Sequence, residues 1–160
     1  DGSSGEGGGQ ILRTSLSLSA LTGKPLHLYN IRGKRRKPGL MRQHMTGAKA
    51  VAEICNGTLS GAELNSGDLV LEPGKIHGGN YSFAVGSAGS TILIAQTILP
   101  LLLTAHEPSH VVIEGGTHAV NAPVYDYFER VYLPQLRKMG AGVTVSLERY
   151  GFYPAGGEVF

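Results

Sequence analysis

Apolar residues in the first half of the chain follow two different spacings. In residues 10–21 they recur every three or four positions and Gly23 follows them, which predicts a helix that ends at this glycine. Residues 25–31 alternate between apolar and polar side chains and predict a strand. A second helix is expected at residues 40–55, and two short strands are expected at residues 58–63 and 68–71.

The second half repeats this order of elements, with a strand before its first helix. The pattern predicts, in chain order, a strand at residues 80–85, a helix at 91–104, a strand at 110–114, a helix at 123–139, a strand at 143–148 and a last strand from Glu158. Glycine-rich loops at residues 86–90 and 115–117 separate these elements.

Both halves thus follow the order strand–helix–strand–helix–strand–strand, except that the first half has no first strand. We interpret the chain as an α/β (α+β) protein of two tandem βαβαββ units, each a four-stranded sheet with two helices on one face. The first unit would span residues 1–73 and the second residues 74–160. A sheet that lacks its first strand exposes an edge to which another chain can add, so a homodimer is one expected state.

Basic residues are concentrated in one segment of the chain. Of the 14 lysines and arginines, nine lie between Gly7 and Ala52, a span that contains none of the 12 acidic residues. The net charge of +2 therefore conceals a one-sided distribution. Such a surface attracts polyanions and raises their association rate, which favours a phosphate-bearing partner.

Cysteine content and hydropathy argue against a disulfide-bonded secreted protein and against a membrane protein. The single cysteine, Cys55, cannot form an internal disulfide, which fits an intracellular protein, cytoplasmic or, in a eukaryote, nuclear. We find no secretory signal peptide. The most apolar stretch, residues 91–105, contains Gln96 and Pro100 and is short for a membrane span, so no membrane association is expected. The chain begins at Asp1 without a methionine, and we expect it to be part of a longer protein.

The segment Gly5-Glu6-Gly7-Gly8-Gly9-Gln10 comes directly before the first predicted helix. Glycines let backbone N–H groups approach a ligand, and a helix N-terminus favours anions, so the segment fits a phosphate site. It is neither a Walker loop nor a dinucleotide fingerprint, and a tight turn without a ligand explains it equally well. Arg13 shares a helix face with Gln10. A carboxylate such as Glu6 beside arginines can orient a guanidinium or help to hold a metal, and the alternative is a surface capping cluster.

The run Arg32-Gly33-Lys34-Arg35-Arg36-Lys37 is the densest basic stretch. Arginine forks bind phosphate oxygens with two hydrogen bonds, and a predicted helix begins just after the run, so we favour a phosphate role over a solvated loop or a localisation signal. Arg42 extends this surface, whereas His44 fits a structural role better than a catalytic one. Gln96 has two interpretations, a contact to a base or ribose and, favoured by local physics, a backbone partner. We find no metal-binding pattern and no complete nucleophile–base set.

Six segments of the chain occur together and in a characteristic order. They are DGSSGEGGGQILRTSLSLSALTGKPL, IRGKRRKPGLMRQH, GAEL, FAVGSAGST, EGGTHAVNAP and RYGFYPAGGE. Together they resemble the RNA 3'-terminal phosphate cyclase family over nearly the whole chain. The resemblance implies repeated βαβαββ units, as in enolpyruvyl transferases, with a small domain inserted after the second unit. It also implies ATP-dependent conversion of an RNA 3'-phosphate end to a 2',3'-cyclic phosphate, through enzyme–AMP and RNA-adenylate intermediates, with a divalent metal (Mg or Mn).

The resemblance assigns roles to individual residues. Glu6, Arg13, Arg32 and Arg35 match catalytic positions, Gln10, Gln96 and Pro123 match ATP-binding positions, Arg32, Arg35, Arg42 and Gln43 match positions that bind RNA phosphate, and Glu6 is the candidate metal ligand. The family's nucleophilic histidine lies beyond Phe160. The inserted domain and the last unit are therefore expected to be absent from this chain, which alone should form no covalent AMP adduct.

Two other functions are compatible with parts of the pattern. One is a non-catalytic, cyclase-like RNA-binding protein that acts in ribosome biogenesis, and the intact GEGGGQILR segment and the set of matching arginines argue against it. The other is an enolpyruvyl-transferase relative that acts on small phosphorylated acids. The extent of the basic segment argues against that function.

Overall fold

The computed structural model describes residues 1–154 and 156–159, which divide into two compact units. The first unit contains Asp1–Gly78 together with Thr97–Pro108. The second unit contains Gly79–Gln96 together with Ser109–Phe160. The sequence-based boundary at residue 73 stays a prediction, as does the relation between the two halves as tandem repeats.

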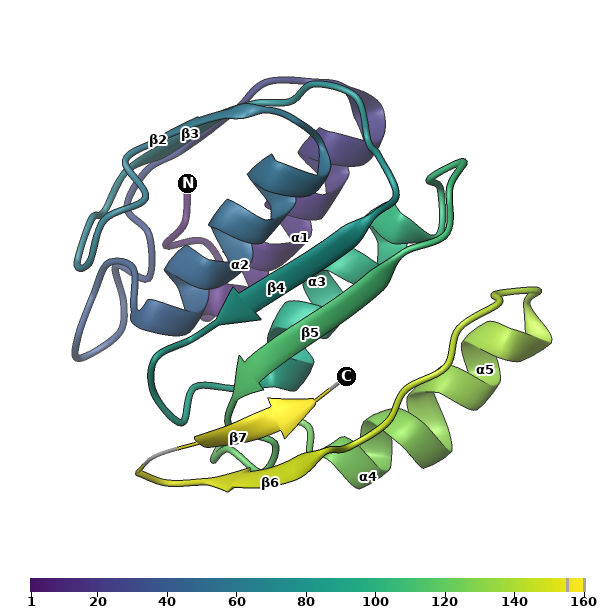
Figure 1. The fold of residues 1–160 in the computed structure, drawn as a ribbon. Helices are drawn as coiled ribbons and strands as arrows, with labels where there is room; N and C mark the ends of the chain where they lie inside the picture. Colours follow the sequence, from purple (N-terminus) through teal and green to yellow (C-terminus); the bar gives the residue numbers. More distant parts are fainter. Residues whose placement is uncertain (155, 160) are drawn as a thin grey trace. The chain divides into compact units, whose positions relative to one another are not determined.

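Two helices form the centre of the first unit and lie side by side (Figure 1). Helix α1 spans Gly9–Thr22 and ends at Gly23, whose φ of 66° is in the left-handed region that glycine adopts most readily. Helix α2 spans Arg42–Ile54. Both predicted helices are confirmed, although α2 begins two residues later than expected because Met41 has an extended backbone.

A small antiparallel sheet covers these helices in the first unit (Figure 1). Its strands are β1 (Leu26–Leu28), β2 (Thr58–Ser60) and β3 (Leu69–Glu72), in the order β1-β3-β2. Leucines from the strands and the helices form the core. Leu12, Leu16, Leu28, Leu69 and Leu71 are at most 3% exposed. Burial of these apolar side chains positions the N-termini of α1 and α2.

The second unit contains a four-stranded sheet of mixed direction, in the order β4-β5-β7-β6. Strands β4 (Asn80–Ala84) and β5 (His110–Gly115) are parallel, and helix α3 (Thr91–Leu102) lies between them in the chain. Strand β7 (Gly156–Val159) pairs antiparallel with both β5 and β6 (Arg149–Phe152). The last strand, expected from Glu158, is confirmed within β7.

The strand predicted at residues 143–148 is wrong. These residues keep the alternation of half-buried and exposed side chains that suggested a strand. A strand also needs a partner for its backbone groups, and the pairing of β6 with β7 starts only at Arg149. The Val143 carbonyl instead accepts a hydrogen bond from Nε of Arg137 at 2.8 Å.

The helix predicted at residues 123–139 is present, but its middle turn is wider than an α-helix. It consists of α4 (Tyr125–Tyr127), a π-helical segment η1 (Phe128–Tyr132) and α5 (Leu133–Lys138). The amide of Leu133 donates to the carbonyl of Phe128, five residues earlier. Pro134 has no N–H to donate in the next turn, which favours such a shift in hydrogen bonding.

The architecture is a mixed α/β fold, as the sequence predicted. Among the described residues, the structure contains no helix whose length and hydropathy would suit a membrane crossing.

Candidate phosphate-binding site

The glycine-rich opening forms a turn that leads directly into α1. Gly5 and Gly7 have φ values of 56° and 60°, and the Gly7 amide closes the turn on the Ser4 carbonyl at 2.9 Å. Gly8 is the N-cap of α1, and no side chain caps this end. The first turn of the helix contains no acidic residue. The N-terminal amides of α1 and the positive end of its dipole are therefore not neutralised by a capping carboxylate.

An ion pair lies over Gly8. Nη2 of Arg35 is 2.8 Å from Oε1 of Glu6, and a Cβ added to Gly8 would collide with that oxygen and lie 2.6 Å from the nitrogen. The Arg35 and Glu6 side chains are 44% and 72% exposed. A pair this exposed contributes at most about 1 kcal/mol, so an incoming phosphate can replace Glu6 as the partner of Arg35.

Arg13 and Gln10 form a second polar group on the first turns of α1. Nη2 of Arg13 donates to Oε1 of Gln10 at 2.9 Å, and Nε2 of Gln10 donates to Oγ1 of Thr14 at 2.7 Å. Partial burial lowers the pKa of the Arg13 guanidinium, and the charge of Glu6 partly opposes this effect. An arginine remains charged in any case, so this side chain is a positioned, partly desolvated cation.

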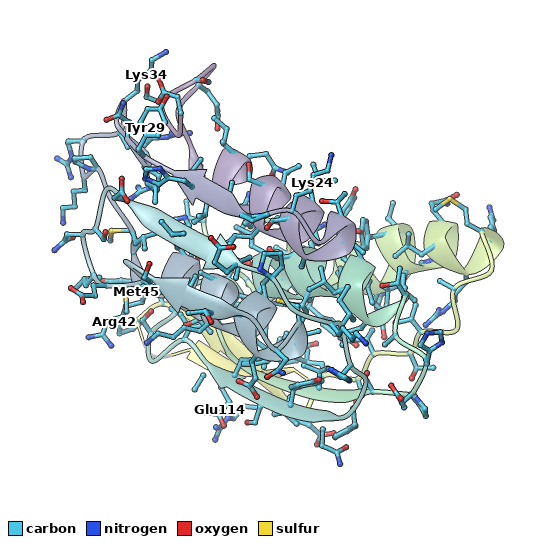
Figure 2. All side chains as sticks on the ribbon, turned by 90° about the horizontal axis from the view of Figure 1, so that it is seen from above. Lys24, Tyr29, Lys34, Arg42, Met45 and Glu114 are labelled. Carbon is cyan, nitrogen blue, oxygen red and sulfur yellow. The ribbon has the colours of Figure 1, made fainter. Side chains whose placement is uncertain are left out.

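The basic loop between β1 and α2 packs against the glycine turn. Nζ of Lys34 donates to the Gly5 carbonyl at 3.0 Å, and Nη1 of Arg32 donates to the Gly39 carbonyl at 2.7 Å. Burial, and secondarily the charge of Arg35, lower the pKa of Arg32. These bonds fix the loop beside the N-terminus of α1. Figure 2 shows the Lys34 side chain on this loop.

His44 comes to the same place from α2. The residue is 7% exposed, and its Nδ1 accepts a hydrogen bond from the Met41 amide at 3.1 Å. Burial, followed by the charges of Arg32 and Arg13, lowers the pKa of His44 to about 4. The ring is therefore neutral at pH 7. Because Nδ1 accepts a hydrogen bond, the ring proton is on Nε2.

The N-termini of α1 and α2 converge at this histidine. A Cβ added to Gly9 would lie 2.6 Å from Nε2 of His44 and 2.9 Å from Nη1 of Arg13. Arg42 and Gln43 are the first two residues of α2, and the Arg42 side chain is exposed (Figure 2). The first unit thus brings together side chains that are far apart in the sequence, namely Glu6, Gln10, Arg13, Arg32, Arg35 and His44. Arg42 and Gln43 precede His44 directly on α2, and their assignment to RNA phosphate stays a prediction.

The two remaining predicted residues belong to the second unit. Gln96 is half-buried on α3, and Pro123 is half-buried two residues before α4. Their assignment to ATP stays a prediction. Within the part of the chain that the structure describes, no three histidine, cysteine or carboxylate side chains are grouped so that they could hold a metal ion.

Comparison with known proteins decides the family. The model of the family described as "RNA 3'-terminal phosphate cyclase" matches residues 4–160. The chain belongs to the RNA 3'-terminal phosphate cyclase family. A curated relative of that name from Koribacter versatilis is 52% identical over 98% of this chain and 44% of its own length. Another, from Pseudomonas fluorescens, is 55% identical over 94% of the chain and 44% of its own length. A third, from Ralstonia nicotianae, is 54% identical over 98% of the chain and 45% of its own length.

The chain thus spans less than half the length of the cyclases it matches. Sequence reasoning favoured a structural role for His44 and did not place it among the phosphate-binding residues. His44 follows the predicted phosphate-binding residues Arg42 and Gln43 directly, and this position was the available signal. Its proximity to Gly9 depends on the packing of α2 against α1, which no local pattern encodes.

Proposed function

We propose that the protein containing this chain converts an RNA 3'-phosphate end to a 2',3'-cyclic phosphate at the expense of ATP. The observation that carries the proposal is the cluster of Arg13, Arg35 and two helix N-termini in a chain of the cyclase family. The relatives named RNA 3'-terminal phosphate cyclase support the same reaction. A non-catalytic role in ribosome biogenesis is retained only as an outcome of the tests below.

The proposed reaction has three steps. A histidine, which the resemblance assigns to a region beyond residue 160, attacks the α-phosphate of ATP and releases pyrophosphate. The AMP group then passes to an oxygen of the RNA 3'-phosphate. Finally the neighbouring 2'-hydroxyl attacks the 3'-phosphorus, its proton is released and AMP leaves, which closes the cyclic phosphate. Each step is a displacement at a phosphorus atom, and positioned hydrogen-bond donors stabilise the negative charge on its oxygens.

The residues of the first unit fit the binding part of this reaction. Arg35 would take the RNA 3'-phosphate with its two-pronged guanidinium once Glu6 is displaced, and Arg13 would neutralise a neighbouring phosphate oxygen. Arg32 would contact a second RNA phosphate, while the bond from its Nη1 to the Gly39 carbonyl holds the loop in place. Gln96 and Pro123, both in the second unit, keep the ATP-binding role that the family resemblance assigns to them.

The described residues could hold a divalent metal only together with a bound phosphate that supplies further metal ligands. Mg²⁺ is commonly held by one or two carboxylates plus substrate phosphates, and the single carboxylate of Glu6 matches that mode. When bound there, the metal would neutralise phosphate charge and polarise a P–O bond. Glu6 would then exchange Arg35 for the metal as its partner.

RNA binding tests the proposal. A short RNA with a 3'-phosphate should bind at least about tenfold more tightly than the same RNA with a 3'-hydroxyl, because only the phosphate engages charged donors. Arg35→Ala should reduce the preference by about tenfold, because Arg13 remains to contact the phosphate. Arg35→Lys, which keeps the charge without the fork, should restore part of it. Equal affinity for the two RNAs would count against the cyclase reaction and favour a general RNA-binding role.

The salt dependence of this binding gives a second measure. Each phosphate contact to a single strand contributes a slope of about −0.7 to log K against log [salt]. The double variant Arg32→Ala/Arg35→Ala should therefore lose about 1.4 units of slope. Lys24→Ala is the matched control, because Lys24 lies after the far end of α1 (Figure 2). An unchanged slope in the double variant would remove both arginines from the site.

A cytoplasmic location and a homodimer stay predictions.

A further inference from the structure

One polar atom of the candidate site, Nε2 of His44, takes part in none of the hydrogen bonds described above. Nε2 of His44 carries the ring proton and faces Gly9, yet no hydrogen bond within the described part of the chain uses it. No buried side-chain nitrogen or oxygen among the described residues lacks a partner. Nε2 therefore retains access to solvent, although the residue as a whole is only 7% exposed. An N–H without a protein partner, on a residue this buried, is suited to donate to a ligand acceptor.

The surroundings of this atom contain donors and positive charge. Gly9 is the first residue of α1 and His44 is the third residue of α2, so the positive ends of two helix dipoles are adjacent. Neither helix has an acidic residue in its first turn. Nη1 of Arg13 faces the same side of Gly9. The nearest described carboxylate of the site, Glu6, is paired with Arg35. An oxyanion at this point would satisfy every one of these groups.

We propose that His44 donates a hydrogen bond from Nε2 to a terminal phosphate oxygen bound at the N-terminus of α1, next to Arg13. The inference rests on the proposed function only for the identity of the phosphate. The Met41 amide fixes the ring orientation and the tautomer, because it occupies Nδ1. His44 thus adds a directed hydrogen bond without adding a further positive charge beside Arg13 and Arg32. Its neutrality follows from its burial and from those two charges.

A purely structural role is the alternative. In that case His44 only accepts the Met41 amide at the start of α2. Two substitutions separate the roles. His44→Asn keeps a hydrogen-bond acceptor near the position of Nδ1 and removes the donor at Nε2. His44→Gln places an amide N–H near the position of Nε2. A structural role predicts that Asn is the better replacement, whereas phosphate binding predicts that Gln is.

The experiment measures dissociation constants by calorimetry for three probes, at constant salt and at pH 7.5. The probes are ATP, an RNA trinucleotide with a 3'-phosphate, and the same trinucleotide with a 3'-hydroxyl. His44→Asn should weaken ATP or the 3'-phosphorylated RNA by about tenfold or more, the effect expected for one hydrogen bond to a charged group. The dissociation constants of His44→Gln should lie within about threefold of those of the parent. Lys24→Ala should bind as the parent does.

The two phosphate probes distinguish the source of the oxyanion. A loss confined to ATP assigns His44 to the nucleotide phosphates, and a loss confined to the 3'-phosphorylated RNA assigns it to the RNA end. Unchanged affinity of His44→Asn for both probes would overturn the inference. So would a His44→Gln variant as weak as His44→Asn, because that result points to packing.

A second measurement keeps the inference testable if the variants fold poorly. In the parent protein, the ¹⁵N signals of the His44 ring should show a protonated Nε2, and the Nε2 signal should shift when the phosphate probe is added. An Nε2 signal that does not respond to saturating ATP or 3'-phosphorylated RNA would refute the contact. A protein that binds phosphate through His44 but forms no cyclic phosphate would refute the proposed function and leave this inference intact.

Discussion

Lowering the pH should destabilise the protein through His44. The folded ring has a pKa of about 4, because it is buried and faces Arg32 and Arg13, whereas the reference value is 6.5. Between these values the unfolded state binds more protons than the folded state, so the free energy of unfolding falls as the pH falls. With these two pKa values the loss from pH 8 to pH 5 is about 2 kcal/mol. Stability from this group is fully present above about pH 6.5.

Urea unfolding followed by circular dichroism, at several pH values between 5 and 8, measures this effect. Other groups titrate in the same range, so the informative quantity is the difference between the parent and His44→Gln. The stability advantage of the parent over the variant should shrink by about 2 kcal/mol between pH 8 and pH 5, because only the parent has an imidazole at this position. Met45→Leu, a non-titrating change in the same helical turn, should keep the parent's pH dependence. Parallel curves for the parent and His44→Gln would show that the ring is not held neutral, and the tautomer argument would fail with it.

Two substitutions test the geometry around the glycine turn. Gly9→Ala should destabilise the fold by about 1–3 kcal/mol in urea unfolding, because the new methyl group would lie 2.6 Å from Nε2 of the buried His44. Gly47→Ala lies in the middle of α2, where an added Cβ would meet no atom within 4 Å apart from its chain neighbours and the helix's own backbone, so it should stabilise the fold by up to about 1 kcal/mol. Stabilisation by both changes would contradict the packing around Gly9. Glu6→Gln should change the free energy of unfolding by less than about 1 kcal/mol, because its ion pair with Arg35 is exposed, and a loss above about 2 kcal/mol would show that the pair cannot readily yield to a phosphate.

The sequence predicted the strongly periodic elements well and the weakly constrained ones poorly. Helix α1 was predicted to within one residue at each end, because its apolar spacing and Gly23 define it locally. Residues 143–148 alternate as a strand does, but alternation does not reveal whether a partner strand is present. The π-helical turn at Phe128–Tyr132 was not predicted, because the hydrophobic spacing of a single turn scarcely differs between the two helix types.

The candidate site, too, was predicted from the sequence only in part. The glycine-rich segment and the arginine run can be found in the sequence, and the resemblance assigned both Glu6 and Arg35 to catalytic positions. Their pairing across 29 residues became visible only in the fold. His44 was assigned a structural role because a lone histidine at a helix start usually has one. Its relation to Gly9 and Arg13 comes from helix packing, which determines both the neutral ring and the direction of its N–H.

The most direct test of the proposed function uses the full-length protein that contains this chain. The protein is incubated with ATP, Mg²⁺ and an RNA labelled at its 5' end and phosphorylated at its 3' end. The account predicts that the 3'-phosphate becomes resistant to alkaline phosphatase as the cyclic phosphate forms, with one AMP released per end, and that Arg35→Ala slows this conversion at least about tenfold. A 3'-phosphate that stays sensitive to phosphatase, in a folded protein that binds ATP, would contradict it.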